Sequence, residues 1–158
     1  MHIKKSPLAL YFQDIPYDSP TLDQLFYLDK NEATTIWKNI IDTKAKGLYD
    51  LPNDSWVAAS TWSLIGTWMD AYNEIEGAHS IPDVISHISN WPQQERLFLI
   101  QNCHNIISLD YNNFASHWQS LFAAFDDGPL LLNQNTSLIT AFRFTPLGDI
   151  ITTKHKIN

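Results

Sequence analysis

The stretch from Phe114 to Leu132 constrains the fold more than any other part of the chain. Its large apolar side chains recur at steps of three and four residues, the spacing of one face of an α-helix. They are Phe114, Trp118, Leu121, Phe122 and Phe125. Gly128 suits a left-handed residue after a helix C-terminus, and Pro129 cannot continue a helix. Three leucines follow, so the sequence predicts a helix that stops sharply before a buried strand.

Two adjacent carboxylates, Asp126 and Asp127, stand at this stop. A helix C-terminus carries partial negative charge, so exposed acids there cost about 0.3–1 kcal/mol each. Two interpretations stay open. The aspartates accept hydrogen bonds from backbone amides of the turn, or they form an acidic corner that receives a basic group of a partner.

The N-terminal half predicts helices that are joined by loops. A short strand or extended arm over residues 6–20 leads through a turn into a short helix over about residues 21–28. Asp29 and Glu32 have the spacing of a capping box, which predicts the start of a second helix that ends near Gly47. Its apolar face consists of Ile36, Trp37, Ile40 and Ile41. A third helix is expected farther along, with a face made of Trp62, Ile65, Met69 and Tyr72, before a loop over 73–80 and a short helix after Pro82.

Beyond Pro92 the apolar pattern changes to that of strands. Two short apolar runs, 97–100 and 106–109, flank a polar turn, which predicts a strand pair. After a helix over 111–125, three further strands are expected over 129–133, 138–144 and 149–155. The fold class is therefore α+β, with N-terminal helices packed on one face of a mainly antiparallel C-terminal sheet. A length of 158 residues fits a single domain.

Composition limits the classes of function. Ten Lys and Arg against seventeen Asp and Glu give a net charge of −7. This acidity disfavours direct binding of nucleic acid, which needs a basic surface, and suits steering toward a basic protein. No stretch approaches the roughly 20 apolar residues of a membrane span. The N-terminus lacks the apolar run of a signal peptide, so we expect a cytoplasmic protein.

No motif in the sequence predicts catalysis, a metal or a cofactor. The single Cys103 excludes an intrachain disulfide and a cysteine-based zinc site, and the six histidines lack zinc-binding helical spacings. Gly-rich phosphate loops and the serine-hydrolase elbow are absent from the sequence. We therefore expect no enzyme. The alternative is a small housekeeping enzyme or ligand-binding protein, favoured if His104, Asp110 and His117 lined one pocket.

Aromatic residues add a second argument for protein binding. Trp37 and Trp118 are expected in the core, whereas Trp56, Trp62, Trp68 and Trp91 lie in less regular sequence. Exposed aromatic side chains that are flanked by acids form good protein-binding surfaces. The candidate partner-binding residues are Asp126, Asp127, Asp70, Glu74, Glu76 and Trp68.

The run 96–110, the pair Phe114 and Trp118, and the segment Phe-Asp-Asp-Gly-Pro-Leu-Leu at 125–131 carry a resemblance. Together they resemble a small bacterial family of uncharacterised proteins with a strand pair, a Phe-x3-Trp helix and a terminal Asp-Asp-Gly-Pro-Leu-Leu. Residues 36–38 fit the same pattern, and residues 56–77 depart from it. More loosely, the chain is similar to small acidic bacterial immunity proteins. That resemblance implies an inhibitor that binds and occludes a basic, nuclease-like toxin domain.

Overall fold

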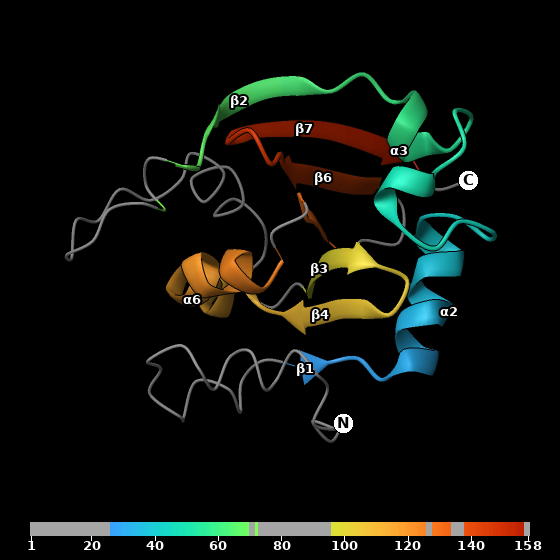
Figure 1. The fold of residues 1–158 in the computed structure, drawn as a ribbon, viewed down its shortest axis with the longest axis horizontal. Helices are drawn as coiled ribbons and strands as arrows, with labels where there is room; N and C mark the ends of the chain where they lie inside the picture. Colours follow the sequence, from blue (N-terminus) through green and yellow to red (C-terminus); the bar gives the residue numbers. More distant parts are fainter. Residues whose placement is uncertain (1–25, 70–71, 73–95, 126–127, 134–137, 157–158) are drawn as a thin grey trace.

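A computed structural model describes residues 26–69, 72, 96–125, 128–133 and 138–156 (Figure 1). Several predicted features lie outside these residues: the arm over 6–20, the first part of the helix over 21–28, the loop over 73–80, the helix after Pro82, and the side chain of Trp91.

Seven strands of the described chain form one sheet in the order β1-β4-β3-β5-β6-β7-β2. Every pair of neighbours is antiparallel. The strands are β1 (Phe26–Tyr27), β2 (Ser63–Thr67), β3 (Leu97–Asn102), β4 (Asn105–Leu109), β5 (Leu130–Asn133), β6 (Leu138–Phe144) and β7 (Asp149–Lys156). The predicted α+β class is confirmed, and so are the five C-terminal strands. Two strands from the N-terminal half, β1 and β2, add to the two edges of that sheet.

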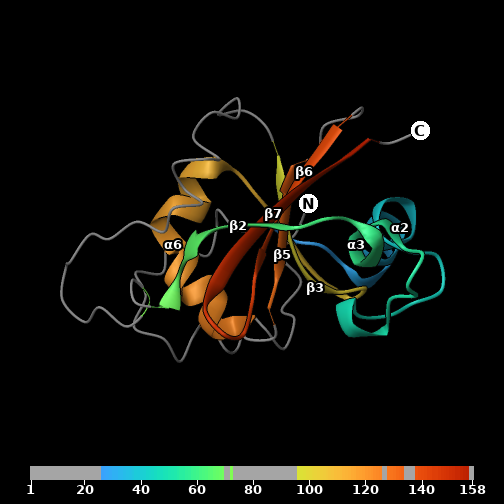
Figure 2. The same cartoon turned by 90° about the horizontal axis from the view of Figure 1, so that it is seen from above.

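The helices cover both faces of the sheet. The N-terminal helices share one face, as the sequence predicts, and the helix that follows β4 covers the other face. They are α2 (Lys30–Ile40), α3 (Trp56–Ala59), α6 (Tyr111–Ala124) and the 3-10 helix η2 (Leu48–Asp50). Seen from above, α6 lies on one side of the strands, whereas α2 and α3 lie on the other (Figure 2). Successive side chains of a strand point to opposite faces, and here both sets are apolar, so both faces need a cover. None of the described helices is long and apolar enough to cross a bilayer.

The first core lies between α6 and one face of the sheet. The predicted helix face is confirmed, because Phe114, Trp118, Leu121, Phe122 and Phe125 are all buried there. The sheet contributes Leu97, Leu99, Ile107, Leu109, Leu131, Phe142, Phe144 and Ile150. Gly128 has a positive φ of 72°, the left-handed conformation that the sequence predicted after this helix.

The second core lies between α2, α3 and the opposite face. Trp37, which is 1% exposed, is its largest fully buried side chain, and its indole N–H donates to the backbone oxygen of Ala45 at 2.7 Å. The strands supply the residues that alternate with those of the first core, including Phe98, Ile100, Ile106, Leu130, Leu132, Ile139 and Ala141. The sequence correctly placed both Trp37 and Trp118 in the core.

The capping box at the start of α2 is confirmed. One carboxylate oxygen of Asp29 accepts from the backbone N–H groups of Asn31 and Glu32 at 2.9 Å. The Glu32 side chain accepts in turn from the backbone N–H of Asp29 at 3.2 Å. These bonds satisfy donors that a helix leaves unpaired at its first turn.

The predicted end of this helix near Gly47 is wrong, because α2 ends at Ile40. Asp42 folds the chain back by accepting backbone hydrogen bonds from Ala45 at 2.6 Å and Lys44 at 2.8 Å. These bonds favour the charged carboxylate and lower the pKa of Asp42. The carboxylate thus competes with helix continuation, as short polar side chains do at turns.

Two other helix predictions are wrong. Phe26–Tyr27 is strand β1, paired with Ser108 and Ile107, although it fell in the predicted helix over 21–28. The face predicted from Trp62 to Tyr72 does not exist, because β2 occupies its centre and pairs with β7. Trp62 packs against the second core, and Ile65, Met69 and Tyr72 pack against the first. Pairing with distant strands outweighed the local spacing.

Candidate functional site

The turn between β6 and β7, residues 145–148, presents the most exposed large apolar side chain among the described residues. Leu147 is 90% exposed at its tip. The backbone N–H of Thr145 donates to Asp149 at 2.9 Å, and that of Gly148 donates to Thr145 at 3.0 Å. The Thr145 hydroxyl also accepts from the backbone N–H of Asp149 at 3.0 Å. These three hydrogen bonds fix the backbone of the turn in a conformation that leaves the Leu147 side chain exposed to solvent.

Trp68 fixes this turn to the first core. Its backbone N–H donates to the oxygen of Gly148 at 2.9 Å, and its indole N–H donates to the oxygen of Thr145 at 3.0 Å. The ring meets Phe122 edge-on, with 5.2 Å between centroids. Only 8% of Trp68 is exposed, so it offers a partner little area and instead positions the turn.

The chain neighbours of two acidic segments meet at the same turn. Met69 approaches Gly148 so closely that a Cβ built on this glycine would lie 2.8 Å from the Met69 Cβ. On Gly128, a Cβ would lie 3.0 Å from the Pro146 ring and 3.1 Å from the oxygen of Phe144. Met69 precedes Asp70 and Gly128 follows Asp127, and consecutive Cα atoms are about 3.8 Å apart. Asp70 and Asp127 are thus each one residue away from contacts with a single turn.

The candidate acids themselves lie outside the described residues: Asp70, Glu74, Glu76, Asp126 and Asp127. Their sequence context is nevertheless informative. Residues 70–95 and 126–127 together hold seven acidic residues and no Lys or Arg. The other ten acidic residues are balanced by the ten Lys and Arg of the chain. The whole net charge of −7 therefore comes from two segments that each have one described neighbour, Met69 or Gly128, at the turn.

Leu147 was missed by the sequence reasoning, although a signal was present. Pro146 and Gly148 lie between the predicted strands 138–144 and 149–155, where a hairpin turn is expected, and an apolar residue between them has no strand or helix in which to bury its side chain. The convergence of Met69 and Gly128 had no such signal, because it depends on contacts between distant parts of the chain. We call residues 145–148 together with Met69 and Gly128 the turn surface.

The residues of the enzyme alternative do not share one pocket. His104 is exposed in the β3–β4 turn, whereas Asp110 caps α6 at the other end of β4 by accepting from the backbone N–H of Asn113 at 2.8 Å. A strand of this length separates them by roughly 16 Å. The side chain of His117 lies outside the described residues. Cys103 is a buried free thiol, and no cluster of three potential metal ligands occurs in the part of the chain that the structure describes.

The remaining tryptophans of the middle segment are half-buried and structurally engaged. The indole N–H of Trp56 donates to the oxygen of Ile40 at 2.6 Å, and that of Trp62 donates to Val57 at 2.9 Å. Trp56 also stacks on His155, with 4.7 Å between ring centroids. These contacts hold α3 against the end of α2 and against β7. Trp56 and Trp62 therefore serve packing of the fold and not a binding surface.

A profile of the family described as "Protein of unknown function (DUF2947)" matches residues 8–148. The chain belongs to the DUF2947 family. This confirms the expectation of an uncharacterised family. No curated protein and no solved structure matches the chain. The DUF2947 match includes β1, the three α-helices of the described residues and the turn surface up to Gly148.

Proposed function

We propose that this DUF2947 protein is a binding protein, most concretely an immunity-type inhibitor that occludes a basic, nuclease-like toxin domain. One observation carries the proposal: the two segments that hold all of the net negative charge each have one described neighbour, Met69 or Gly128, at a turn with an exposed leucine. An apolar anchor whose chain neighbourhood is rich in charge is typical of a protein interface.

The proposed mechanism divides the work between charge and apolar contact. Nucleases need basic clefts to hold phosphates, so a dense acidic surface speeds encounter and selects for such a partner. Asp70, Glu74, Glu76, Asp126 and Asp127 supply that charge. Leu147 then docks in an apolar part of the partner, and Trp68 keeps the turn in place. Bound in this way, the inhibitor excludes the substrate from the cleft. We place this activity in the bacterial cytoplasm.

The apolar anchor is tested by Leu147→Ala. Because the side chain is 90% exposed, the free energy of unfolding should change by less than about 0.5 kcal/mol. Affinity for the partner should fall by about 2 kcal/mol or more, as for a central interface residue. The measurement is titration calorimetry on the partner that the wild-type protein captures from a bacterial lysate. Leu64→Ala is the matched control, since Leu64 is 67% exposed but lies on β2. Equal losses for both variants would contradict the anchor role.

The acidic corner is tested by changing both Asp126 and Asp127 to Asn. If they bind a partner, affinity should fall by about 2 kcal/mol or more, mainly through slower association, and the loss should shrink as salt rises. If they only cap a turn, partner affinity stays unchanged. The control is the double change of Asp50 and Asp54 to Asn, which removes the same charge at two exposed positions far along the chain from either acidic segment.

The identity of the captured protein decides the toxin part of the proposal. A basic domain whose nuclease activity is abolished by stoichiometric wild-type protein supports it. A captured domain that stays active contradicts occlusion. If no protein is captured and a small metabolite copurifies instead, the ligand-binding alternative replaces the immunity proposal.

A further inference from the structure

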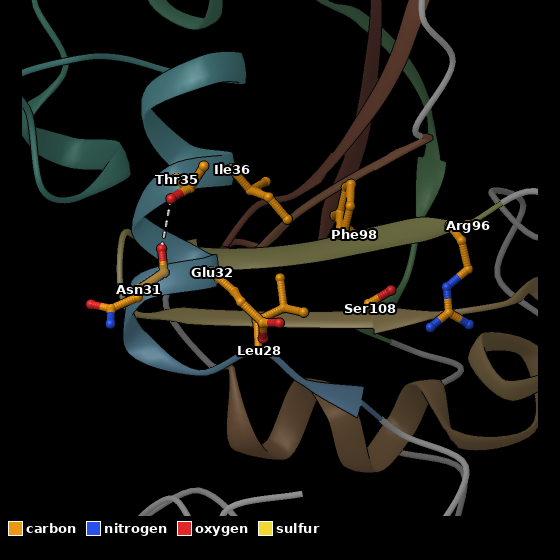
Figure 3. A pocket seen from close by; sticks show the side chains of 8 residues that line it. All are labelled: Leu28, Asn31, Glu32, Thr35, Ile36, Arg96, Phe98 and Ser108. Carbon is orange, nitrogen blue, oxygen red and sulfur yellow. Dashed lines mark hydrogen bonds between the residues drawn. The ribbon is translucent and has the colours of Figure 1, made fainter. Parts of the chain in front are cut away.

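A second site lies on the opposite face of the sheet, away from the turn surface. A cavity of about 460 Å³ opens between the N-terminal half of α2 and strands β3 and β4 (Figure 3). Leu28, Ile36 and Phe98 form its apolar part, and Asn31, Glu32 and Thr35 line it from α2. Arg96 and Ser108 line it from the strands. Its volume and mixed lining are those of small-molecule sites.

Ser108 is the unusual member of this lining. It is 3% exposed and pairs in register with Phe98, so both side chains face the same side of the sheet. Its hydroxyl has no hydrogen-bond partner among the residues that the structure describes, although it lines the cavity. A buried hydroxyl that makes no hydrogen bond is destabilising. A ligand atom that accepts a hydrogen bond from it would therefore replace the bond to water that the hydroxyl lost on burial.

Arg96 supplies the only positive charge among the described lining residues. It stands two residues before Phe98, so its side chain leaves the same face of the sheet. In Figure 3 its guanidinium bends from β3 toward β4, the strand that carries Ser108. A guanidinium binds a carboxylate through two parallel hydrogen bonds, which a hydroxyl donor beside it can supplement.

We propose that this cavity binds a small monocarboxylate with an apolar body. The carboxylate accepts from Arg96 and Ser108, and the body lies on Leu28, Ile36 and Phe98. The described lining favours a monoanion over a phosphate dianion, because Glu32 lines the same cavity and repels added negative charge. Glu32 keeps its place through the capping bond from Asp29, so it remains part of the lining in the bound state.

Titration calorimetry of the full chain with hydrocinnamate tests the ligand class, and its neutral amide is the matched probe. Hydrocinnamate should bind saturably at one site with a Kd below about 1 mM, and the amide at least about 10-fold more weakly. Arg96→Gln and Arg96→Lys should each weaken hydrocinnamate binding about 10-fold or more, because neither keeps the planar donor fork. Arg143→Gln, which changes the other arginine of the chain, should leave it unchanged. Equal binding of acid and amide, or unchanged binding by both Arg96 variants, overturns the proposal.

Ser108→Ala separates a ligand-binding role from a structural one. Removing a buried hydroxyl that has no partner among the described residues should leave the Tm of the free protein unchanged or raise it. Hydrocinnamate affinity should fall about 10-fold or more, the loss of one hydrogen bond to a charged group. Unchanged affinity would contradict the assignment of Ser108. Leu147→Ala should not affect hydrocinnamate binding, so failure of the partner proposal and failure of this one are distinguishable.

Discussion

Replacing Trp118 by alanine is expected to lower the free energy of unfolding by about 3–5 kcal/mol, the usual effect of removing a buried indole. Trp118 is 7% exposed on α6. Its ring meets Phe122 edge-on at 5.6 Å between centroids and lies 6.4 Å from Tyr72. The change therefore leaves a cavity beside Phe122 and Tyr72 in the core between α6 and the sheet. Chemical denaturation measured by circular dichroism gives the free energy directly.

An exposed aromatic provides the control for that experiment. Tyr49 is 66% exposed and has the guanidinium of Arg143 5.4 Å from its ring centre. Tyr49→Ala should cost no more than about 1 kcal/mol, the range of an exposed cation–π contact. A loss below about 1 kcal/mol for Trp118→Ala as well would place Trp118 outside the core and contradict the packing of α6.

Gly148→Ala is expected to destabilise the protein by about 2–4 kcal/mol, because two separate penalties apply. The φ of Gly148 is +99°, a conformation that L side chains rarely adopt. The new methyl group would also lie 2.8 Å from the Cβ of Met69, which is close to the backbone and cannot swing away. Thermal and denaturant unfolding of the purified variant measure the loss.

Gly47→Ala is the matched change for this experiment. Gly47 has a φ of −140°, which any residue adopts, and a Cβ there would meet the Asp50 carboxylate at an ordinary 3.4 Å. This variant should lie within about 1 kcal/mol of the wild type. Comparable losses at both glycines would show that the Met69 contact and the turn conformation do not matter to stability.

Much of the fold was predictable because its signals are local. The apolar residues from Phe114 to Phe125 recur at helical spacing. The predicted strands after them are apolar runs that are separated by segments containing Gly, Pro or Asn. The capping box at Asp29 is likewise complete within four residues. In each case the information lies within one element, so a single sequence is enough to recover it.

The edges of the sheet were not predictable for the opposite reason. Phe26–Tyr27 is a strand only because β4 lies beside it, and Ser63–Thr67 only because β7 does. The candidate site likewise has one part that the sequence predicts and one part that only the structure shows. Acidic residues and the hairpin turn are visible in the sequence, whereas the approach of Met69 and Gly128 to that turn depends on tertiary contacts. The presence of Arg96 and Ser108 in the lining of one cavity depends on strand register, which places Ser108 opposite Phe98.

The position of β2 beside β7 also affects how the chain reaches its native state. Ser63 pairs with Thr152, so this strand leaves the ribosome long before its partner has been made. Until then its backbone donors and the exposed Leu64 lack the neighbour that they have in the folded sheet. Such long-range pairing slows folding and leaves a strand available to other chains. A nascent chain stopped before β7 should therefore be prone to association, and completion of the last strand is what closes the fold.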